Sequence, residues 1–323
     1  MGGGTTKRPY QIYTADELKK MQEAIESKPD EYKGAAFELM DDVALPEGED
    51  WNPIGSAEKP FEGTFNGNGH TVSGLAVNGS AKDNQGLFGV NAGTIENLTV
   101  EGSVAGKDNV GGIVGTNTAE GVIRDCIGNA EVSGENNVGG VVGKNEGSVI
   151  RCATKTDGKA ESGSGNADKG SVSGTGSNTG GIAGSNDGVI KDSTNNADVA
   201  GGTNTGGVTG NNGNSGTVLG GGNNGNVTSS DTEGSKDNTG GLVGKNENEA
   251  GDSVSGSYKK DETTNKDLTG IGGKEDAGDV QAVTGDVKNP QKPFEGSGTV
   301  KDPYKIKTED DLKKLADLVN SGE

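Results

Sequence analysis

The sequence predicts an all-β fold in which short strands wind into stacked coils, a β-helix or solenoid. The 27 Val, 12 Ile, 12 Leu and 5 Phe make up only about 17% of the 323 residues, and the formal net charge is −20. Such a composition is typical of disorder unless a thin core is renewed by repetition. The apolar residues do recur at a regular spacing, in runs that are too short for helices and rich in β-branched side chains.

The repeating unit is a G-x-x-G tetrad whose second residue is aliphatic. Successive tetrads begin 26, 28, 41, 26 and 34 residues apart. This indicates a period near 26 with loop insertions, the longest at 156–169. The six tetrads begin at Gly86, Gly112, Gly140, Gly181, Gly207 and Gly241.

Other positions keep a regular relation to each tetrad. The aliphatic residues inside the tetrads are Leu87, Ile113, Val141, Ile182, Val208 and Leu242. A second apolar position follows at Ile95, Ile123, Ile150, Ile190, Val218 and Val254, and a third at Val104, Val132, Val172, Val199 and Val227. Two positions after each tetrad stand Asn91, Asn117, Asn145, Asn186, Asn212 and Asn246. Three positions before each tetrad stand Asp83, Asn109, Asn137, Asn178, Asn204 and Asn238.

These spacings fit three short strands per coil, joined by tight turns. One coil cannot bury its own inner face, but stacked coils cover one another. Neighbouring coils would pair as parallel strands about 4.8 Å apart, so six coils give a rod of roughly 30 Å. Each inward aliphatic side chain then contributes about 1.5–3 kcal/mol through burial.

Glycine and asparagine have structural roles in such a stack. Gly permits positive φ at corners and lets coils approach closely. Asn tolerates the left-handed region and can hydrogen-bond along its own column. We therefore interpret the Asn columns as corner ladders rather than ligand-binding rows. The tetrads are not phosphate loops, because no Lys-Ser/Thr follows them.

The N-terminal region predicts a lid on the first coil. Residues 14–17 form a capping box before an amphipathic pattern typical of a helix of about three turns. Its apolar positions are Leu18, Met21, Ala24 and Ile25. A solenoid exposes a strand edge and an apolar interior at its end, so we expect this helix to cover them. The first coils are predicted in residues 61–75, with inward Phe61, Phe65, Val72 and Leu75.

A resemblance to a known family rests on three elements. These are the G-[ILV]-x-G tetrads, Phe65-Asn66-Gly67-Asn68-Gly69-His70-Thr71, and the preceding Trp51-Asn52-Pro53-Ile54-Gly55. They resemble the GLUG-motif repeat family of bacterial surface and adhesin-like proteins, which also occurs in non-catalytic regions of some secreted immunoglobulin A peptidases. The resemblance covers about residues 10–255 and implies a right-handed parallel β-helix with no catalytic residue set. Ala183 and Thr209 depart from the motif, and the longer spacings predict irregular coils within 150–235.

The C-terminal segment repeats the beginning of the chain. Residues 303–315 parallel residues 9–21, and 292–296 echo 59–63. This segment either opens a second β-helix module or forms a C-terminal cap. Its helix needs a surface to pack on in either case, through Leu312, Leu315, Leu318 and Val319. Residues 259–289 are polar and acidic and predict at most one irregular strand.

The predicted organisation therefore has five parts. They are an expression leader or disordered segment (1–8), the N-terminal cap helix with the first strands (9–58), the parallel β-helix with six tetrads (59–258), a polar connection (259–302) and the C-terminal helix (303–323).

The candidate chemical residues favour structural roles. His70 is the only histidine, which excludes a His-based triad or a multi-His metal site built from this chain alone. It lies in an Asn-Gly-rich turn and is interpreted as a turn residue. A glycosidase needs two carboxylates facing each other at roughly 5–10 Å. The acidic candidates are close together in the sequence, which does not place two of them across a groove, so we interpret them as residues that solvate a loop or cap a helix. They are Asp41, Asp42, Glu47, Glu49 and Asp50. No catalytic, cofactor-binding or metal-binding residue is assigned.

Calcium is a minor alternative, because oxygen ligands are abundant but no EF-hand loop or G-G-x-G-x-D repeat is present. No other cofactor is expected. Cys126 and Cys152 are 26 residues apart, about one coil. They follow Ile123 and Ile150 at plus three and plus two, which favours buried free thiols over a disulfide.

Composition and resemblance together predict a non-enzymatic, adhesin-like stalk of a secreted or wall-attached bacterial surface protein. We expect the protein to be a monomer. Its expected partner is a host or microbial glycan or protein, which would bind at the insertion loops 156–169 and 228–238. The pI near 4.5 excludes nucleic acid as a partner, and no apolar run reaches the roughly 18 residues of a membrane span. The alternatives are a polysaccharide-degrading β-helix enzyme with Trp51 as a sugar platform, and a non-catalytic accessory region of a larger secreted peptidase.

Overall fold

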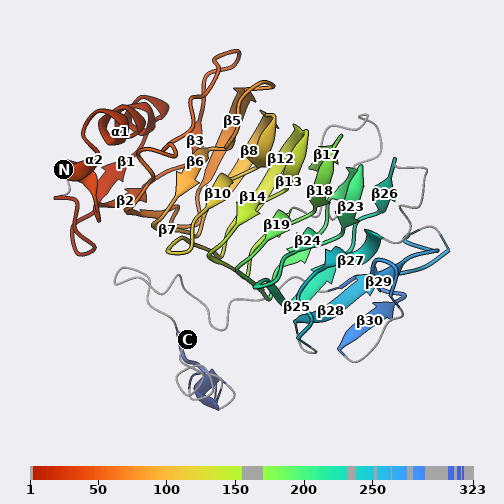
Figure 1. The fold of residues 1–323 in the computed structure, drawn as a ribbon. Helices are drawn as coiled ribbons and strands as arrows, with labels where there is room; N and C mark the ends of the chain where they lie inside the picture. Colours follow the sequence, from red (N-terminus) through yellow and green to blue (C-terminus); the bar gives the residue numbers. More distant parts are fainter. Residues whose placement is uncertain are drawn as a thin grey trace, which may run out of the picture.

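A computed structural model of the chain describes residues 3–154, 170–230, 238–250, 253–262, 264–274, 279–287, 305–308, 311–313 and 315. It shows a parallel β-helix of about nine turns, which confirms the predicted fold class. The coils follow one another along a single axis, from two helices at the N-terminal end to β28, β29 and β30 at the other (Figure 1). The helices are α1 (Ala15–Ser27) and α2 (Pro29–Tyr32).

The strands described belong to two parallel sheets. The first contains 19 strands in two rows. One row is β1 (Tyr10–Ile12), β2 (Ala36–Leu39), β4 (Thr64–Asn66), β7 (Thr94–Glu96), β11 (Val122–Arg124), β15 (Ser148–Ile150), β20 (Val189–Lys191) and the first parts of β25 (Thr217–Asn223) and β28 (Val254–Lys259). The other row is β3 (Val43–Ala44), β5 (Thr71–Asn78), β8 (Thr99–Ala105), β12 (Ile127–Gly134), β16 (Ala153–Thr154), β17 (Ser171–Gly174), β21 (Thr194–Asn195), β22 (Asp198–Gly201) and β26 (Val227–Ser229). The second parts of β25 and β28 continue the row of β21, and β30 (Val280–Val283) pairs there with β28.

The second sheet has 11 strands among the described residues, on either side of the tetrads. Those before the tetrads are β9 (Asp108–Gly111), β13 (Asn136–Gly139), β18 (Ser177–Gly180) and β23 (Thr203–Gly206). Those that begin at the third residue of a tetrad are β6 (Phe88–Asn91), β10 (Val114–Asn117), β14 (Val142–Asn145), β19 (Ala183–Asn186) and β24 (Thr209–Asn212). β27 (Thr239–Asn246) runs through the sixth tetrad and pairs with both β23 and β24, and β29 (Thr269–Ile271) pairs with β27. Because Gly112 and Ile113 separate β9 from β10, the coil that runs from β9 to β12 holds four strands instead of the expected three.

The core is a set of stacked aliphatic columns. All six tetrad aliphatics are fully buried, and backbone hydrogen bonds join neighbours in this column, such as Ile113 N to Val141 O at 3.0 Å and Val141 N to Ile182 O at 3.1 Å. The third column pairs as predicted, from Val104 to Val227. In the second column the prediction of Ile150 is wrong by one residue: Val149 pairs with Ile123 and Ile190, whereas Ile150 pairs with Arg124.

Two asparagine ladders run along the β-helix and confirm the structural interpretation of these columns. In the first, each side-chain amide donates to the next coil, from Asn91 to Asn246, at 2.8–2.9 Å. In the second, the amides donate in the opposite direction, from Asn204 back to Asn84, at 2.8–3.1 Å. Asn84 and not the predicted Asp83 is the first member, and all five members have positive φ.

Aromatic rings close the N-terminal end of the core. Phe61 and Phe65 lie 5.2 and 5.4 Å from Phe88, measured between ring centroids. Phe37 extends this cluster to Tyr10, Tyr32 and Phe61. Val72 and Leu75 are buried beside them, so the four inward residues predicted for the first coils are confirmed. α1 packs on this end with Leu18, Met21 and Ile25 buried.

The structure describes a turn at the N-terminal end and corrects the number of strands expected near the C-terminal end. Residues 3–8, expected as a leader or disordered, form a turn that bridges Thr5 to Arg8 and accepts a hydrogen bond from Ala36 N through Gly4 O. Residues 259–289 contain two strands and not one at most: β29 pairs with β27 and β30 with β28. Coils with register shifts at β28 and β29 therefore extend about 25 residues further than expected, because short strands with small residues suffice once a preceding coil offers an edge.

Near the C-terminus, residues 311–313 and 315 are helical. The side chains of Leu312 and Leu315 are exposed. Of the predicted second module, residues 305–308 and 311–313 are described, and the Thr308 hydroxyl accepts a hydrogen bond from Asp311 N at 3.1 Å. Leu318 and Val319 lie outside the described residues.

Candidate functional site

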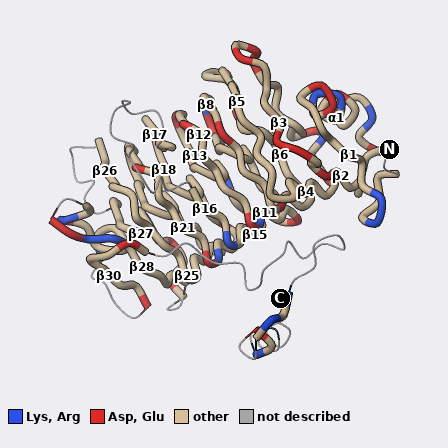
Figure 2. The backbone as a smooth tube through the Cα atoms, turned by 180° about the vertical axis from the view of Figure 1, so that it is seen from behind, with Lys and Arg blue, Asp and Glu red and all other residues tan. Residues whose placement is uncertain are grey.

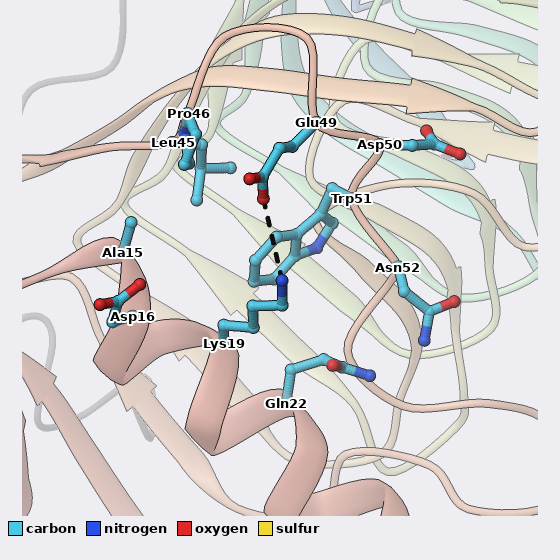
Figure 3. A pocket seen from close by; sticks show the side chains of 10 residues that line it. All are labelled: Ala15, Asp16, Lys19, Gln22, Leu45, Pro46, Glu49, Asp50, Trp51 and Asn52. Carbon is cyan, nitrogen blue, oxygen red and sulfur yellow. Dashed lines mark ion pairs between the residues drawn. The ribbon is translucent and has the colours of Figure 1, made fainter.

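A cavity of about 180 Å³ lies at the N-terminal cap, between α1 and the loop of residues 45–52. We call it the cap pocket. Figure 3 shows Lys19 of the helix reaching toward Glu49 and Trp51 of the loop, whereas Asp50 points away from them. The lining residues are Ala15, Asp16, Lys19, Gln22, Leu45, Pro46, Glu49, Asp50, Trp51 and Asn52.

The helix wall of the cap pocket is held by capping and by burial. The Thr14 hydroxyl accepts a hydrogen bond from Glu17 N at 3.3 Å, and the Glu17 carboxylate accepts one from Tyr13 N at 2.7 Å. These bonds satisfy backbone donors at the N-terminal end of α1. With Leu18, Met21 and Ile25 anchored in the core, α1 cannot rotate about its axis without exposing apolar surface.

The loop wall is held by hydrogen bonds to two segments, β5 and the first tetrad. Leu45 N donates to Ser73 O at 2.9 Å, and Trp51 N donates to Ala76 O at 2.7 Å. The Asp50 carboxylate accepts Asn78 N at 2.8 Å. The indole nitrogen of Trp51 donates to Leu87 O, inside the first tetrad, at 3.1 Å. Because the polar edge of the indole is satisfied by the β-helix, the ring is fixed as a wall of the cap pocket.

Acidic groups dominate the charge of the cap pocket. Asp16, Glu49 and Asp50 face one basic group, Lys19, whose Nζ lies 3.8 Å from the Glu49 carboxylate. Both members of this pair are more than half exposed, so their ion pair is weak. The side chains can therefore move apart for a ligand at little energetic cost.

Gln22 is the unusual member of the lining. It is only 8% exposed, yet its carboxamide makes no hydrogen bond with any of the described residues. The polar atoms of Gln22 are not among the fully buried side-chain atoms that lack a partner, so they keep contact with solvent through the cap pocket. Sequence analysis missed this residue, although the spacing Leu18, Met21, Gln22, Ile25 places Gln22 on the inward face of a helix. Ala24, which was predicted on that face, is only partly buried.

The predicted acidic candidates divide between this pocket and a neighbouring turn. Glu49 and Asp50 line the cap pocket, while Glu47 and Asp41 do not. The Asp42 carboxylate accepts a hydrogen bond from Thr71 N at 2.9 Å and lies 3.3 Å from Nδ1 of His70. The pKa of Asp42 is lowered, mainly by the Thr71 N–H bond and also by His70, against an opposing effect of desolvation. His70 is thus part of a turn, as interpreted from the sequence.

The two cysteines are buried free thiols. With Val149 in place of Ile150, both follow the second apolar column at plus three, so they are stacked neighbours and the earlier offset argument is wrong. Burial raises the pKa of the Cys126 thiol well above its usual value, and the adjacent Cys152 raises it further. The thiols donate weakly to backbone carbonyls, for example Cys126 Sγ to Ile95 O at 3.7 Å.

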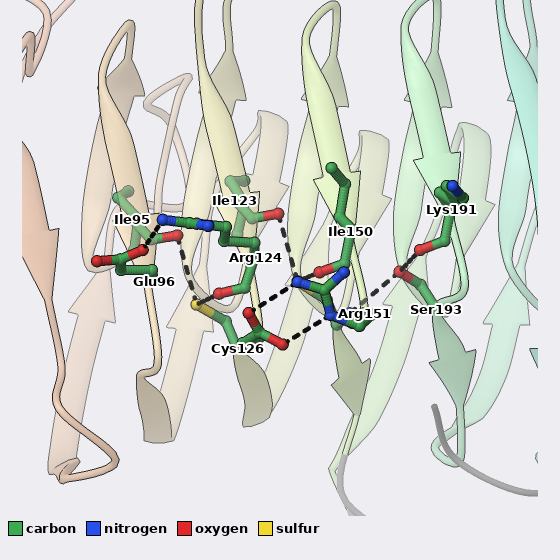
Figure 4. Close-up of polar contacts among 11 residues, drawn as sticks. Ile95, Glu96, Ile123, Arg124, Cys126, Ile150, Arg151, Lys191 and Ser193 are labelled. Carbon is green, nitrogen blue, oxygen red and sulfur yellow. Dashed lines mark hydrogen bonds and ion pairs between the residues drawn. The ribbon is translucent and has the colours of Figure 1, made fainter. Parts of the chain in front are cut away.

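A row of ion pairs lies outside the same columns (Figure 4). Glu96 pairs with Arg124, and Arg151 binds Asp125 through Nε and one terminal nitrogen at 3.0 and 3.1 Å. Asp125 and Arg151 are mostly buried and both have positive φ at a coil corner. Figure 2 shows acidic and basic residues close together near β11 and β15. These charges satisfy one another, so we assign the row to coil stacking.

Other predicted contact regions are described only in part. The loop 156–169 lies outside the described residues, as do residues 231–237 of the loop 228–238. Among the residues that the structure describes, no cluster of three or more His, Cys, Asp or Glu is arranged to hold a metal ion. No helix in the described part is both long and apolar enough to cross a lipid bilayer.

Comparisons with known proteins relate the chain to β-helix structures. No protein-family model matches the sequence. A stretch of 82 residues, 24% of the chain, is 35% identical to a protein of Evansella cellulosilytica named as a candidate Gly-rich membrane protein. That match spans only 9% of the length of the relative.

The fold is similar to the crystal structure of a candidate immunoglobulin A1 protease from Bacteroides ovatus, with a TM-score of 0.58. The similarity covers 88% of this chain and 86% of that one, at 19% sequence identity. At this identity the similarity defines the class of protein by its fold, a parallel β-helix with a helical N-terminal cap.

Proposed function

We propose that this chain is a non-enzymatic segment of a secreted or wall-attached bacterial surface protein, a stiff stalk that presents a ligand-binding surface. The observation that carries the proposal is the uninterrupted stack of coils. Backbone pairing and two asparagine ladders link each coil to the next over most of its length. We assign the chain to the GLUG-motif repeat family as part of this proposal.

Stiffness follows from the way the coils are joined. A buried side-chain amide that bridges two coils must lose its partner if the coils separate, which costs about 1–3 kcal/mol for each group left unpaired. Such bridges occur at five successive steps between Asn91 and Asn246. Bending the rod therefore opens many bonds together, which suits a spacer between a cell surface and a partner.

Three observations are consistent with a surface location. The relative in Evansella cellulosilytica is named as a Gly-rich membrane protein, and the similar structure is named as an immunoglobulin A1 protease. The two free thiols are buried, so they do not conflict with an oxidising compartment. The net charge of −20 keeps a long repeat protein soluble.

The experiment is an array of host and microbial glycans and matrix proteins, probed with the purified chain. Binding to a limited set of them supports a ligand-presenting role, and binding to none leaves only the spacer role. The same preparation is incubated with polysaccharides and assayed for new reducing ends. Release of reducing ends at a rate proportional to protein concentration would establish the enzyme alternative in place of this proposal.

A second candidate is a non-catalytic accessory region of a larger secreted peptidase. It is favoured by the similarity of fold to a protein named as an immunoglobulin A1 protease. The complete gene distinguishes the two: a metalloprotease motif downstream supports the accessory role, and a wall-anchoring signal supports the stalk.

A further inference from the structure

We infer that the cap pocket is a binding site for a single uncharged sugar residue. This inference rests on the proposed ligand-presenting function and names the ligand class and its position. Nothing in the repeat pattern requires a cavity at this end of the solenoid, since a lid could pack on the first coil without one.

The dimensions suit one small ring. A volume of about 180 Å³ lies below the roughly 300–1,000 Å³ of pockets for drug-sized ligands. The indole of Trp51 offers a flat apolar wall, against which the C–H groups of a pyranose ring can pack. The ring is already positioned by its bond to Leu87 O, so no ordering of the indole is required on binding.

Gln22 supplies the polar counterpart. A carboxamide presents one acceptor and two donors, which match two neighbouring hydroxyl groups. Its burial at 8% exposure, with no hydrogen-bond partner among the described residues, leaves these groups available to the cavity. A hydroxylated ligand would replace the water that these solvent-accessible groups contact in the empty pocket.

The charges of the cap pocket select against anions. Asp16 and Glu49 are acceptors for ligand hydroxyls, while Asp50 is partly occupied by Asn78. Three carboxylates against one ammonium group repel a carboxylate, sulfate or phosphate on the ligand. A neutral hexose or N-acetylhexosamine therefore fits this chemistry, and a uronic or sialic acid does not.

The sole tryptophan makes the test specific. Trp51 is the only tryptophan in the chain, so fluorescence excited at the red edge of indole absorption reports on the cap pocket alone. The folded full chain is titrated with methyl glycosides of neutral hexoses and N-acetylhexosamines, and separately with glucuronic acid. We expect a saturable change in emission with at least one neutral sugar and none with glucuronic acid.

Two leucine variants distinguish binding at the cap pocket from effects elsewhere in the molecule. Gln22→Leu keeps the size of the side chain but removes its hydrogen-bonding groups, and should weaken binding about tenfold, the effect of about 1.4 kcal/mol. The control is Gln281→Leu, an exposed position on β30 at the far end of the β-helix, which should bind as the parent does. Thermal unfolding verifies that both variants are folded.

The outcomes distinguish this inference from the proposed function. Absence of a saturable change with every neutral sugar, or equal affinity in Gln22→Leu and the parent, overturns the pocket assignment. If Gln22→Leu also keeps the binding pattern of the parent on the glycan array, adhesion is located elsewhere and the proposed function stands. If Gln22→Leu loses both signals, the cap pocket is the ligand site.

Discussion

At the scale of single residues, asparagine is the side chain on which this protein most depends. One set of asparagines occupies left-handed corners, and a second set is buried in a ladder between coils. Both uses follow from a short side chain that carries a donor and an acceptor. The second ladder ends at Asn204, whose Oδ1 is buried with no partner in the part of the chain that the structure describes.

The buried ladder gives a direct stability prediction. Asn145→Ala removes an acceptor for Asn117 and a donor for Asn186, so unfolding should become easier by about 1–3 kcal/mol for each group left unpaired. Urea denaturation measures the change. Asn214→Ala, at an exposed turn position, is the matched control and should have a small effect; equal destabilisation by the two variants would contradict a role for the ladder.

The Asp42 turn predicts a dependence on pH. The folded pKa of Asp42 is below its ordinary value of 3.8 because Thr71 N–H donates to the carboxylate. A lowered pKa means that the contribution of Asp42 to stability is complete above pH 3.8 and is lost as the pH falls through the folded pKa.

The difference in urea midpoint between the parent and Asp42→Ala should therefore be constant at higher pH and shrink in the acid range. Asp267→Ala, an exposed aspartate, is the control. A difference that stays constant down to the acid limit would show that the Thr71 bond does not favour the ionised form.

At the scale of elements, the glycines of the tetrads allow neighbouring coils to pack closely against one another. A Cβ added at Gly140 would lie 2.3 Å from Gly181 O and 2.5 Å from Cγ2 of Thr154. The glycine is required here for close approach between coils, since its φ is not in the left-handed region.

Gly140→Ala should destabilise the protein by about 1–3 kcal/mol through overpacking, measured by thermal and urea unfolding. The control is Gly285→Ala, where no heavy atom lies within 4 Å of the added Cβ, and its effect should be near zero. A tolerated Gly140→Ala would mean that the coils can separate without loss of packing.

The stacked cysteines give a prediction for the coils that contain them. Cys126 and Cys152 are fully buried, and the raised pKa of Cys126 keeps its thiol protonated. We expect neither thiol to react with iodoacetamide in the native protein and both to react in urea, as read by mass spectrometry. A mass two units lower in the non-reduced protein, with no alkylation in urea, would show a disulfide instead.

At the scale of the whole molecule, like-charge repulsion opposes the compact rod. The net charge of −20 is spread over a chain with few apolar residues, so screening should stabilise it. Raising the salt from about 0.01 M to about 0.15 M shortens the Debye length from about 30 to about 8 Å. The melting temperature should rise, and equally with NaCl and KCl.

Calcium chloride at matched ionic strength is the comparison that tests for a bound cation. An equal rise of the melting temperature fits screening alone. A larger rise at low calcium concentration would show a specific site and support the calcium alternative raised by the composition.

Much of the fold is predictable because its information is periodic. The columns of Leu87 and Val104, the inward Phe61 and Phe65, and the capped helix at residue 14 all follow from spacing and residue type. The errors at Ile150 and Asp83 are slips of one residue, where an adjacent side chain of similar type occupies the expected position. The sequence did not predict both β29 and β30, because these segments become strands by pairing with β27 and β28 and not through a residue pattern of their own.

The sequence by itself determined the stacked architecture, because each repeat carries the same small set of side chains and buries them only against its neighbours. The tertiary structure alone decided where a cavity lies. Gln22, Glu49 and Trp51 come from a helix and a loop that no repeat specifies. They meet because the lid and the first tetrad are packed against the same end of the core, a contact between segments far apart in the chain.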